Sequence, residues 1–338
     1  MIRFAFAGLR HGHIFSLVDE VDKHPETTIV AAAEADAATR ADVKQKDAIR
    51  ITHTDPYQMM EEVECDVVAI GDVYGWRGPL AIRALELGHH VIVDKPPCTR
   101  LTEWEHIADL SAMRGLEVGC QLAMRTDKQL SMARRLIADG AIGEVQTVSF
   151  LGQHPLMWGS RASWYFQTGL HGGTINDLAI HGYDIVEWIS GRRLVEVVAA
   201  QTWNAKTVGC PFFQTGAQAM HKLDNQGGVL SDVSYFSPDR CGYQVPAYWR
   251  FTIHGTAGMI ERQKDSDGLF VATDDNKSPQ IVACDQPVHG YFEDFLACIE
   301  ERTPPGGLDT NTVLRASQLA LLTQRAADEN IKGLKIPA

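Results

Sequence analysis

The first 125 residues alternate short apolar segments with stretches of helical periodicity, and this alternation restricts the fold of the 338-residue chain more than any other feature. Strands are predicted at residues 2–7, 28–33, 66–70, 90–93 and 116–120. Helices are predicted at 14–23, 56–62, 79–87 and 102–113, the last with Thr102 as N-cap and Glu105 completing a capping box. Strands that alternate with helices over short loops predict a doubly wound parallel sheet.

A glycine turn directly follows the first predicted strand. The segment Gly8-Leu-Arg-His-Gly-His13 lies between that strand and a helical pattern that begins at Ile14. In this context, backbone N–H groups and a helix dipole can bind the pyrophosphate of a dinucleotide. Arg10 and His13 stand where further glycines are usual, but Gly12 allows close approach and Arg10 can itself meet a phosphate. The loop favours a dinucleotide-binding, or Rossmann, domain at residues 1–124.

The second predicted strand ends in Glu34. An acid at this position can accept hydrogen bonds from the adenosine ribose and would repel a 2′-phosphate, which favours NAD over NADP. Arg40 nearby keeps NADP as an alternative, and an exposed glutamate at the start of a loop is the purely structural interpretation.

The fourth predicted strand ends abruptly in Asp94-Lys95-Pro96. Open α/β sheets bind their ligands at the carboxyl ends of their strands, and Pro96 stops the strand because proline cannot donate to a sheet ladder. Lys95 is therefore placed to hold a substrate hydroxyl or a cofactor group. A surface lysine that caps a strand end is the alternative.

The pattern changes after a predicted helix at Asp127–Asp139. The β-rich segments are 145–152, 195–203, 217–223, 228–236, 247–254, 258–261 and 268–273. Several of them alternate apolar with polar residues, which predicts a mostly antiparallel sheet with one packed face and one face free for another layer or subunit. We expect residues 125–338 to form an α/β domain with a large open sheet. Helices over 291–301 and 313–330 should pack back towards the first domain.

A second cluster of polar residues lies within a predicted helix that ends at Gly191. Asp177 and His181 are one helical turn apart and should share a face, with Asp184 three residues further on. Carboxylates beside an imidazole can orient it and raise its pKa towards the range of a general acid or base. A buried histidine with satisfied hydrogen bonds is the alternative.

Taken together, these segments resemble the Gfo/Idh/MocA oxidoreductases, a family that includes glucose–fructose oxidoreductase and inositol dehydrogenase. Asp94-Lys95-Pro96 is similar to the family's Glu-Lys-Pro motif. Asp177-x-x-x-His181-x-x-Asp184, preceded by Gly172-Gly173, is similar to its Gly-Gly-Gly…Asp-x-Gly-x-His-x-x-Asp segment. Ile253-His-Gly-Thr-x-Gly258 and the two C-terminal helices also match, so the resemblance covers nearly the whole chain.

The resemblance implies hydride transfer between a nicotinamide cofactor and a secondary alcohol carbon of a sugar, cyclitol or sugar acid. It implies that Lys95 binds the reacting hydroxyl, that His181 is the general acid/base, and that Asp177 holds substrate or orients His181. The expected pocket wall consists of Gln121, Arg125 and Trp164. The expected cofactor contacts are Gly8, Arg10, His11, Gly12, His13, Glu34, Asp72, Trp76, Arg77, Asp94 and Lys95.

The sequence departs from the family's pattern at several places. Asp94 replaces the usual glutamate, and His171 and Ala179 replace glycines. Arg10 and His13 interrupt the glycine loop, and the turn at 72–77 lacks the common Pro-Asn…His pattern. The changes at residue 10 and at 72–77 bear on how the cofactor binds more than on whether a catalytic site exists.

Composition excludes several other classes of protein. The net charge of −12, without a block of lysine and arginine, argues against nucleic acid or an anionic membrane as partner. Seven scattered cysteines without a CxxC pair, the lack of a signal peptide and the absence of a long apolar run predict a cytoplasmic protein. His11 and His13 lack a third ligand in sequence, so no metal is expected.

Three functions remain open at this point. The first is an NAD(P)-dependent dehydrogenase for sugars or polyols, working as a homodimer or homotetramer through the free sheet face. The second uses tightly held NAD for transient oxidation during glycoside cleavage or epimerisation. The third is a nucleotide sensor or scaffold without catalysis, which the altered glycine loop suggests. The catalytic trio favours the first.

Overall fold

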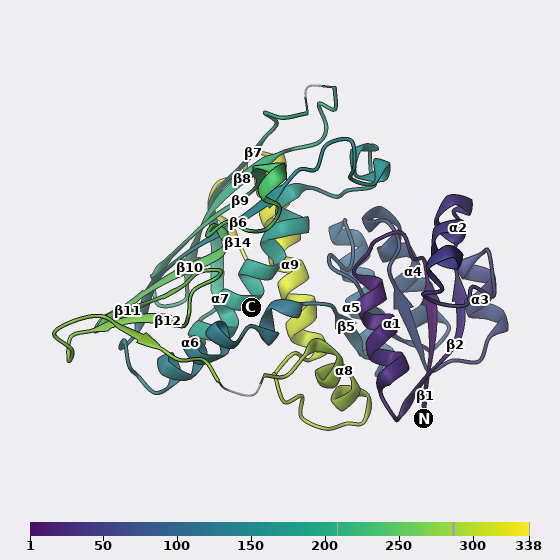
Figure 1. The fold of residues 1–338 in the computed structure, drawn as a ribbon, viewed down its shortest axis with the longest axis horizontal. Coiled ribbons are helices and arrows are strands. Elements are labelled where there is room, and N and C mark those ends of the chain that lie inside the picture. Colours follow the sequence, from purple (N-terminus) through teal and green to yellow (C-terminus); the bar gives the residue numbers. More distant parts are fainter. Residues whose placement is uncertain (208, 286–287, 338) are drawn as a thin grey trace. The chain divides into compact units, whose positions relative to one another are not determined.

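The computed structural model describes residues 1–207, 209–285 and 288–337, and they form two compact units (Figure 1). The first unit contains Met1–Leu122, Gly169–Gly172 and Gly290–Ser317. The second contains Ala123–Thr168, Gly173–His289 and the chain from Gln318 onward. The first unit thus combines the N-terminal part of the chain with two segments that come from beyond residue 124.

A parallel sheet forms the centre of the first unit, with strand order β2-β1-β3-β4-β5. The strands are β1 (Ile2–Ala7), β2 (Thr27–Ala33), β3 (Val67–Ile70), β4 (His90–Val93) and β5 (Val118–Cys120). Most of their residues are buried, as expected for a sheet covered on both faces. The predicted doubly wound sheet is confirmed. Because β2 and β3 lie on opposite sides of β1, the crevice between β1 and β3 is the topological switch point at which such sheets bind ligands.

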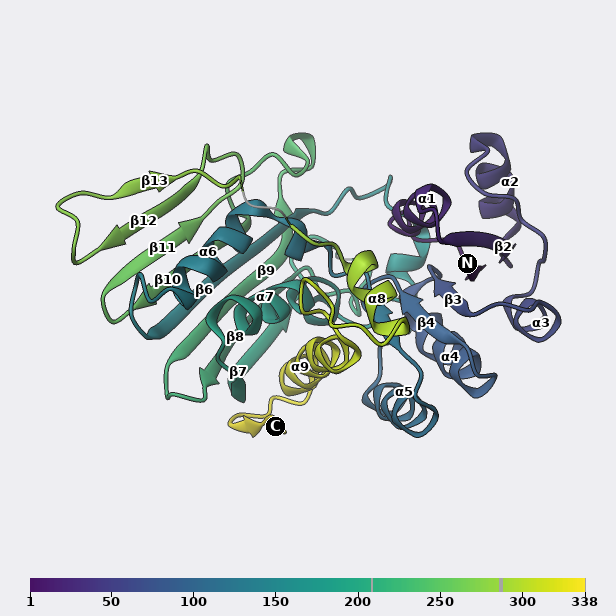
Figure 2. The ribbon, with the colours of Figure 1, turned by 90° about the horizontal axis from the view of Figure 1, so that it is seen from below.

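Helices cover both faces of this sheet: α1 lies on one face, and α4 and α5 lie on the other (Figure 2). The helices are α1 (Ile14–Lys23), α2 (Ala37–Lys46), α3 (Pro56–Glu62), α4 (Tyr74–Glu86), α5 (Leu101–Arg114), α8 (Tyr291–Ile299) and the start of α9 (Thr310–Asp328).

Two helix starts differ from the prediction. Helix α4 begins at Tyr74 rather than Pro79, because the buried side chains of Tyr74 and Arg77 anchor an additional turn before the proline. Helix α5 begins at Leu101, so Thr102 is not its N-cap and the predicted capping box with Glu105 does not form. The Glu103 carboxylate instead accepts a hydrogen bond from the backbone N–H of Thr99.

The second unit contains a large sheet with the strand order β13-β12-β11-β10-β6-β9-β8-β7-β14. The strands are β6 (Val145–Pro155), β7 (Leu194–Trp203), β8 (Gly216–Leu223), β9 (Gly228–Ser237), β10 (Tyr248–Gly255), β11 (Gly258–Arg262), β12 (Leu269–Thr273), β13 (Gln280–Val282) and β14 (Leu334–Lys335). All neighbours are antiparallel except β6 and β9. The predicted mostly antiparallel open sheet is therefore confirmed.

Helices α6 (Lys128–Ala138) and α7 (Ile180–Ser190) lie on the same face of the large sheet (Figure 1). A π-helical turn, Ile175–Ala179, leads directly into α7. The sequence predicted one continuous α-helix here, so the spacing of the side chains before Ile180 differs from the expected one. Single π-helical turns often mark functional sites. Short 3₁₀ helices at Ala123–Thr126, Ser163–Phe166 and Asp239–Cys241 complete the unit.

Candidate active site

The glycine loop lies at the carboxyl end of β1 and has the geometry of a close backbone approach. Gly8 has a φ of +77°, and a Cβ atom added to it would lie 2.4 Å from the Cβ of Asp72. Gly12 is open, with nothing within 4 Å of an added Cβ. His13 is the N-cap residue of α1, and the N–H groups of Ile14, Phe15 and Ser16 donate to the loop carbonyls of His11, Gly12 and His13. The loop therefore lies at the N-terminal end of a helix dipole and at the switch point of the sheet, where an anion is stabilised.

Glu34 is fully buried, and backbone groups already satisfy its carboxylate. Its oxygens accept hydrogen bonds from the N–H of Leu9 at 2.6 Å and from the N–H of Asp36 at 2.7 Å. The Arg10 side chain lies 3.3 Å from the same carboxylate. Glu34 thus ties the glycine loop to the end of β2, a structural role that the sequence did not indicate beside its predicted contact with ribose.

Arg10 lies between two acids and an aromatic ring. Its Nε atom is 3.3 Å from Glu34 and 3.5 Å from Asp72, and its guanidinium carbon is 4.4 Å from the centre of the Trp76 ring. Burial raises the pKa of Asp72 to about 6, and the nearby Glu34 carboxylate adds to the shift. The positive charge of Arg10 therefore offsets two buried or nearly buried carboxylates beside the loop.

A buried polar network surrounds Asp94 at the end of β4. Arg77 donates to the Asp94 carboxylate at 2.8 Å, and the Nδ1 atom of His11 contacts the same oxygen. The Nε2 atom of His11 lies 3.2 Å from the Tyr74 hydroxyl. Burial lowers the pKa of His11 to about 4, so its imidazole is neutral at pH 7. Burial alone would raise the pKa of Asp94, but the charge of Arg77 and the contact with His11 hold it well below its usual range.

Lys95 and Gln121 lie at the ends of the neighbouring strands β4 and β5. Lys95 is buried, and its Nζ atom is 5.9 Å from the centre of the Tyr74 ring. Gln121 donates from Nε2 to the carbonyl of His13 at 3.1 Å and to the Tyr291 hydroxyl at 3.0 Å. Its buried Oε1 atom accepts no hydrogen bond within the described part of the chain. Tyr291, from α8, was not identified by the sequence, because nothing local connects it with β5.

Asp177 and His181 occupy the junction between the π-helical turn and α7 in the second unit. Asp177 is buried and accepts a hydrogen bond from the hydroxyl of Tyr235 on β9. The His181 ring meets the Trp249 ring edge-on, with 5.5 Å between the ring centres. Burial and the Asp177 carboxylate raise the pKa of Tyr235 well above its usual value, so the hydroxyl stays protonated and donates. Tyr235 and Trp249 were missed because neither residue lies within a motif that the sequence offers.

Arg125 and Asp184 form a buried ion pair rather than flanking His181. The guanidinium donates to both carboxylate oxygens, from Nε at 3.0 Å and from Nη2 at 2.6 Å. The sequence placed Arg125 in the expected pocket wall, and the structure pairs its guanidinium with the Asp184 carboxylate. Trp164 is also buried, and its ring centre is 4.1 Å from that of Tyr165.

The structure therefore groups the predicted site residues within each unit. The predicted cofactor contacts, Lys95 and Gln121 belong to the first unit. Asp177, His181, Arg125 and Trp164 belong to the second.

Comparison with known proteins identifies the family. Residues 2–121 match the model of the oxidoreductase family with an NAD-binding Rossmann fold, and residues 130–261 match the Gfo/Idh/MocA C-terminal domain. The chain belongs to the Gfo/Idh/MocA oxidoreductase family. The resemblance inferred from the sequence motifs is thereby confirmed, and so is the NAD-binding class of the first unit.

Curated relatives of this Gfo/Idh/MocA protein include levoglucosan dehydrogenase of Pseudarthrobacter phenanthrenivorans, which is 23% identical over 77% of this chain and 72% of the relative. The scyllo-inositol 2-dehydrogenase (NAD(+)) of Bacillus subtilis is 23% identical over 77% of this chain and 73% of the relative. With two other curated relatives the chain aligns over only about half of their length. A solved structure from Thermotoga maritima superposes with a TM-score of 0.85 at 22% identity, covering 98% of this chain and 100% of that one.

The loop residues of this family member fit a dinucleotide. The open space at Gly12 lies beside the N-terminal end of α1, where a helix dipole stabilises a pyrophosphate, and the positive φ of Gly8 allows the chain its tight turn into the loop. No helix within residues 1–207, 209–285 and 288–337 combines the length and apolar character needed to cross a membrane.

Proposed function

We propose that this chain is an NAD-dependent oxidoreductase that moves a hydride between the nicotinamide ring and a secondary alcohol carbon of a sugar, cyclitol or sugar acid. The observation that carries the proposal is the position of Lys95. This lysine is buried at the carboxyl end of β4. The glycine loop follows the carboxyl end of β1, so both lie at the same end of the parallel strands. The names of the curated relatives, which include sugar and inositol dehydrogenases, support the same class of substrate.

Each proposed role follows from the chemistry of the side chain. The Lys95 ammonium donates to the reacting hydroxyl and stabilises negative charge on its oxygen. The His181 imidazole takes the hydroxyl proton during oxidation, because a hydride leaves the C–H bond only as the O–H proton is removed. Asp177, held by the Tyr235 hydroxyl, binds a neighbouring substrate hydroxyl or orients His181. The nicotinamide, when bound, accepts the hydride.

The remaining predicted contacts concern the cofactor and the substrate separately. Gly8, Gly12 and His13 hold the pyrophosphate at the start of α1, with Arg10 as a charged neighbour. The other proposed cofactor contacts are His11, Asp72, Trp76, Arg77 and Asp94. The proposed contacts with substrate are Gln121 and Trp164, and Arg125 is proposed to support the pocket wall through its ion pair with Asp184.

The preference for NAD rests on the charges at the end of β2. Glu34 places a buried carboxylate there, and a 2′-phosphate would be repelled by it. Arg40, the residue that keeps NADP open, donates to the backbone carbonyls of Glu34 and Ala35 at 2.9 and 2.7 Å.

Titration of the purified protein with NADH and NADPH, followed by nicotinamide fluorescence, tests the cofactor. We expect NADH to bind at least tenfold more tightly than NADPH. A panel of polyols, sugars and sugar acids with NAD⁺ then tests the substrate class by the rise in nicotinamide absorbance. Failure to bind either nucleotide would overturn the proposal, and selective NADPH binding would overturn the role given to Glu34.

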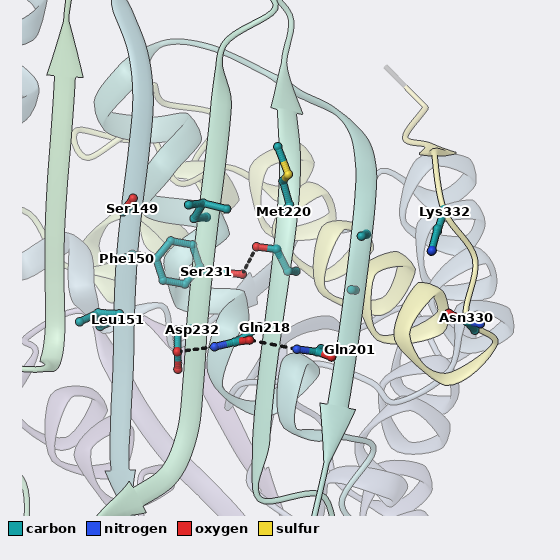
Figure 3. Close-up of a pocket in the computed structure, with 14 residues that line it drawn as sticks. Ser149, Phe150, Leu151, Gln201, Gln218, Met220, Ser231, Asp232, Asn330 and Lys332 are labelled. Atoms are coloured by element: carbon teal, nitrogen blue, oxygen red, sulfur yellow. Dashed lines mark hydrogen bonds between the residues drawn. The ribbon is translucent and has the colours of Figure 1, made fainter.

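We propose further that two copies of the chain associate through the open face of the large sheet. A pocket of about 700 Å³ lies on the sheet. Within it, Gln218 is hydrogen-bonded to Gln201 on one side and to Asp232 on the other (Figure 3). Met220 and Leu230 line it and are about half exposed. Burying such apolar side chains against a second copy stabilises a dimer.

Light scattering during gel filtration tests this association. The native chain should elute with the mass of a dimer or tetramer, and Leu230→Arg should lower that mass. Met113→Arg, which changes an exposed methionine on α5, is the control and should leave the mass unchanged. A native monomer would contradict the proposal.

We also propose that the protein works in the reducing cytoplasm. All seven cysteines lie within the described residues, and none forms a disulfide with another. This pattern suits a compartment that keeps thiols reduced.

A further inference from the structure

His11, His13 and Asp94 converge at the switch point of the parallel sheet. His11 and His13 come from the glycine loop after β1, and Asp94 follows β4. One ligand atom from each of the three residues can be chosen so that all lie within 4.8 Å of one another. The sequence argued against a metal because the His-Gly-His segment lacked a third ligand. The fold, however, brings Asp94 to the two histidines as a possible third ligand.

Each of the two histidines lies beside a different oxygen of the Asp94 carboxylate. His11 Nδ1 contacts Asp94 Oδ2, and His13 Nδ1 lies 3.4 Å from Asp94 Oδ1. Asp94 is fully buried, yet its Oδ1 atom accepts no hydrogen bond of good geometry from any described residue. A buried carboxylate oxygen without a donor loses the solvation of its charge, and a bound cation would restore it.

We propose that His11, His13 and Asp94 form a binding site for a divalent transition-metal ion. Two imidazoles and one carboxylate are the ligand set of many zinc and non-haem iron sites that keep an open coordination position. The His13 side chain is 59% exposed, so the open position faces solvent. Lys95 and His181 take no part in this metal site, which shares His11, His13 and Asp94 with the proposed cofactor contacts.

Two of the proposed ligands are already held in place by hydrogen-bonding neighbours, as is common for metal ligands. Coordination through Nδ1 leaves the proton of His11 on Nε2, which lies 3.2 Å from the Tyr74 hydroxyl oxygen, a suitable acceptor. Arg77 holds the Asp94 carboxylate at 2.8 Å, which fixes its orientation. The charge of Arg77 also opposes a dication, so we expect weaker binding than in a structural zinc site.

Metal titration of the full-length protein, stripped with a chelator and free of nucleotide, tests the proposal. Zn²⁺ binding is followed by calorimetry, and Co²⁺ binding by visible absorption, which separates nitrogen and oxygen ligands from cysteine thiolates. We expect one ion per chain. His13→Ala should weaken binding at least about tenfold, because even the loss of an outer-shell partner costs 10–100-fold.

His106→Ala is the matched control, because His106 is an exposed histidine on α5 in the same unit. It should bind metal as the native chain does, and circular dichroism should show that both variants are folded. Absence of binding, or equal affinity in His13→Ala and the native chain, would overturn the proposal. Because no nucleotide or substrate is involved, this result does not depend on the redox function proposed above.

Discussion

Replacing Arg125 by methionine should destabilise the protein strongly, because it leaves the Asp184 carboxylate buried without its partner. The side chains of Arg125 and Asp184 are each 2% exposed and share two hydrogen bonds. Breaking a buried pair by removing one partner costs about 3–5 kcal/mol. Total unfolding free energies are about 5–15 kcal/mol, so this single change should remove a large fraction of the stability.

The double variant Arg125→Met/Asp184→Leu separates the charge effect from the loss of packing. With both charges gone, apolar side chains of similar size fill the space, and such replacements are often neutral or stabilising. We expect the double variant to recover most of the loss. The exposed Arg135, which lies 3.7 Å from Asp139, supplies the control, and Arg135→Met should cost at most about 1 kcal/mol.

Urea unfolding monitored by tryptophan fluorescence measures these effects. Trp188 reports on the site directly, because its ring centre is 5.3 Å from the Arg125 guanidinium carbon. The same variants should be assayed for the KM of any polyol substrate found. If Arg125→Met lowers the unfolding free energy by less than about 1 kcal/mol but raises KM more than tenfold, Arg125 is a direct substrate ligand and the ion-pair account is refuted.

Three further predictions concern the glycine loop, the acid Asp72 and the Asp177 contact. Gly8→Ala should cost about 1–3 kcal/mol of unfolding free energy from its positive φ alone and should also abolish NADH binding, since the added methyl collides with Asp72. Gly12→Ala should leave the unfolding free energy unchanged, because its added methyl meets no protein atom within 4 Å, and should weaken NADH binding only by filling space proposed for the cofactor; urea titration and NADH fluorescence measure the two effects. The folded-state pKa of Asp72 is raised to about 6, so its ionisation should lower the unfolding free energy progressively as pH rises from about 4 to 6. Asp72→Asn should remove this pH dependence. Urea titrations that give the native chain and the variant equal pH profiles would contradict the prediction. Tyr235→Phe should lower kcat about tenfold with little change in NADH affinity, because Asp177 loses the hydroxyl that positions it, and an unchanged kcat would argue that the contact is only structural.

The sequence predicts most of the first unit because the relevant signals are local. Apolar strands, a glycine turn and short loops specify a parallel sheet without knowledge of distant contacts. Helix α2 was not predicted because it is polar on nearly all sides, with Val43 as its buried residue. The false capping box at Thr102 shows the limit of local signals, because the preceding Thr99 N–H binds Glu103 and the helix begins one residue earlier.

Contacts between residues far apart in sequence explain what the motifs could not predict at the site. Asp94 lies 83 residues from His11, and Tyr235 lies 58 residues from Asp177. No spacing rule connects such pairs, so neither the third candidate ligand nor the partner of Asp177 was visible. The π-helical turn likewise depends on tertiary packing, and it invalidates the simple assumption that Asp177 and His181 share the face of one α-helix.

The measurement that tests the central claim most directly is hydride transfer by the native chain and by Lys95→Ala and His181→Asn. Purified proteins would be mixed with NAD⁺ and a panel of cyclitols, sugars and sugar acids, and NADH formation would be followed by absorbance. We predict turnover of at least one compound by the native chain, with kcat reduced about 100-fold or more in each variant while NADH still binds. Undiminished turnover in Lys95→Ala, or tight NADH binding by the native chain without turnover of any compound, would contradict the account.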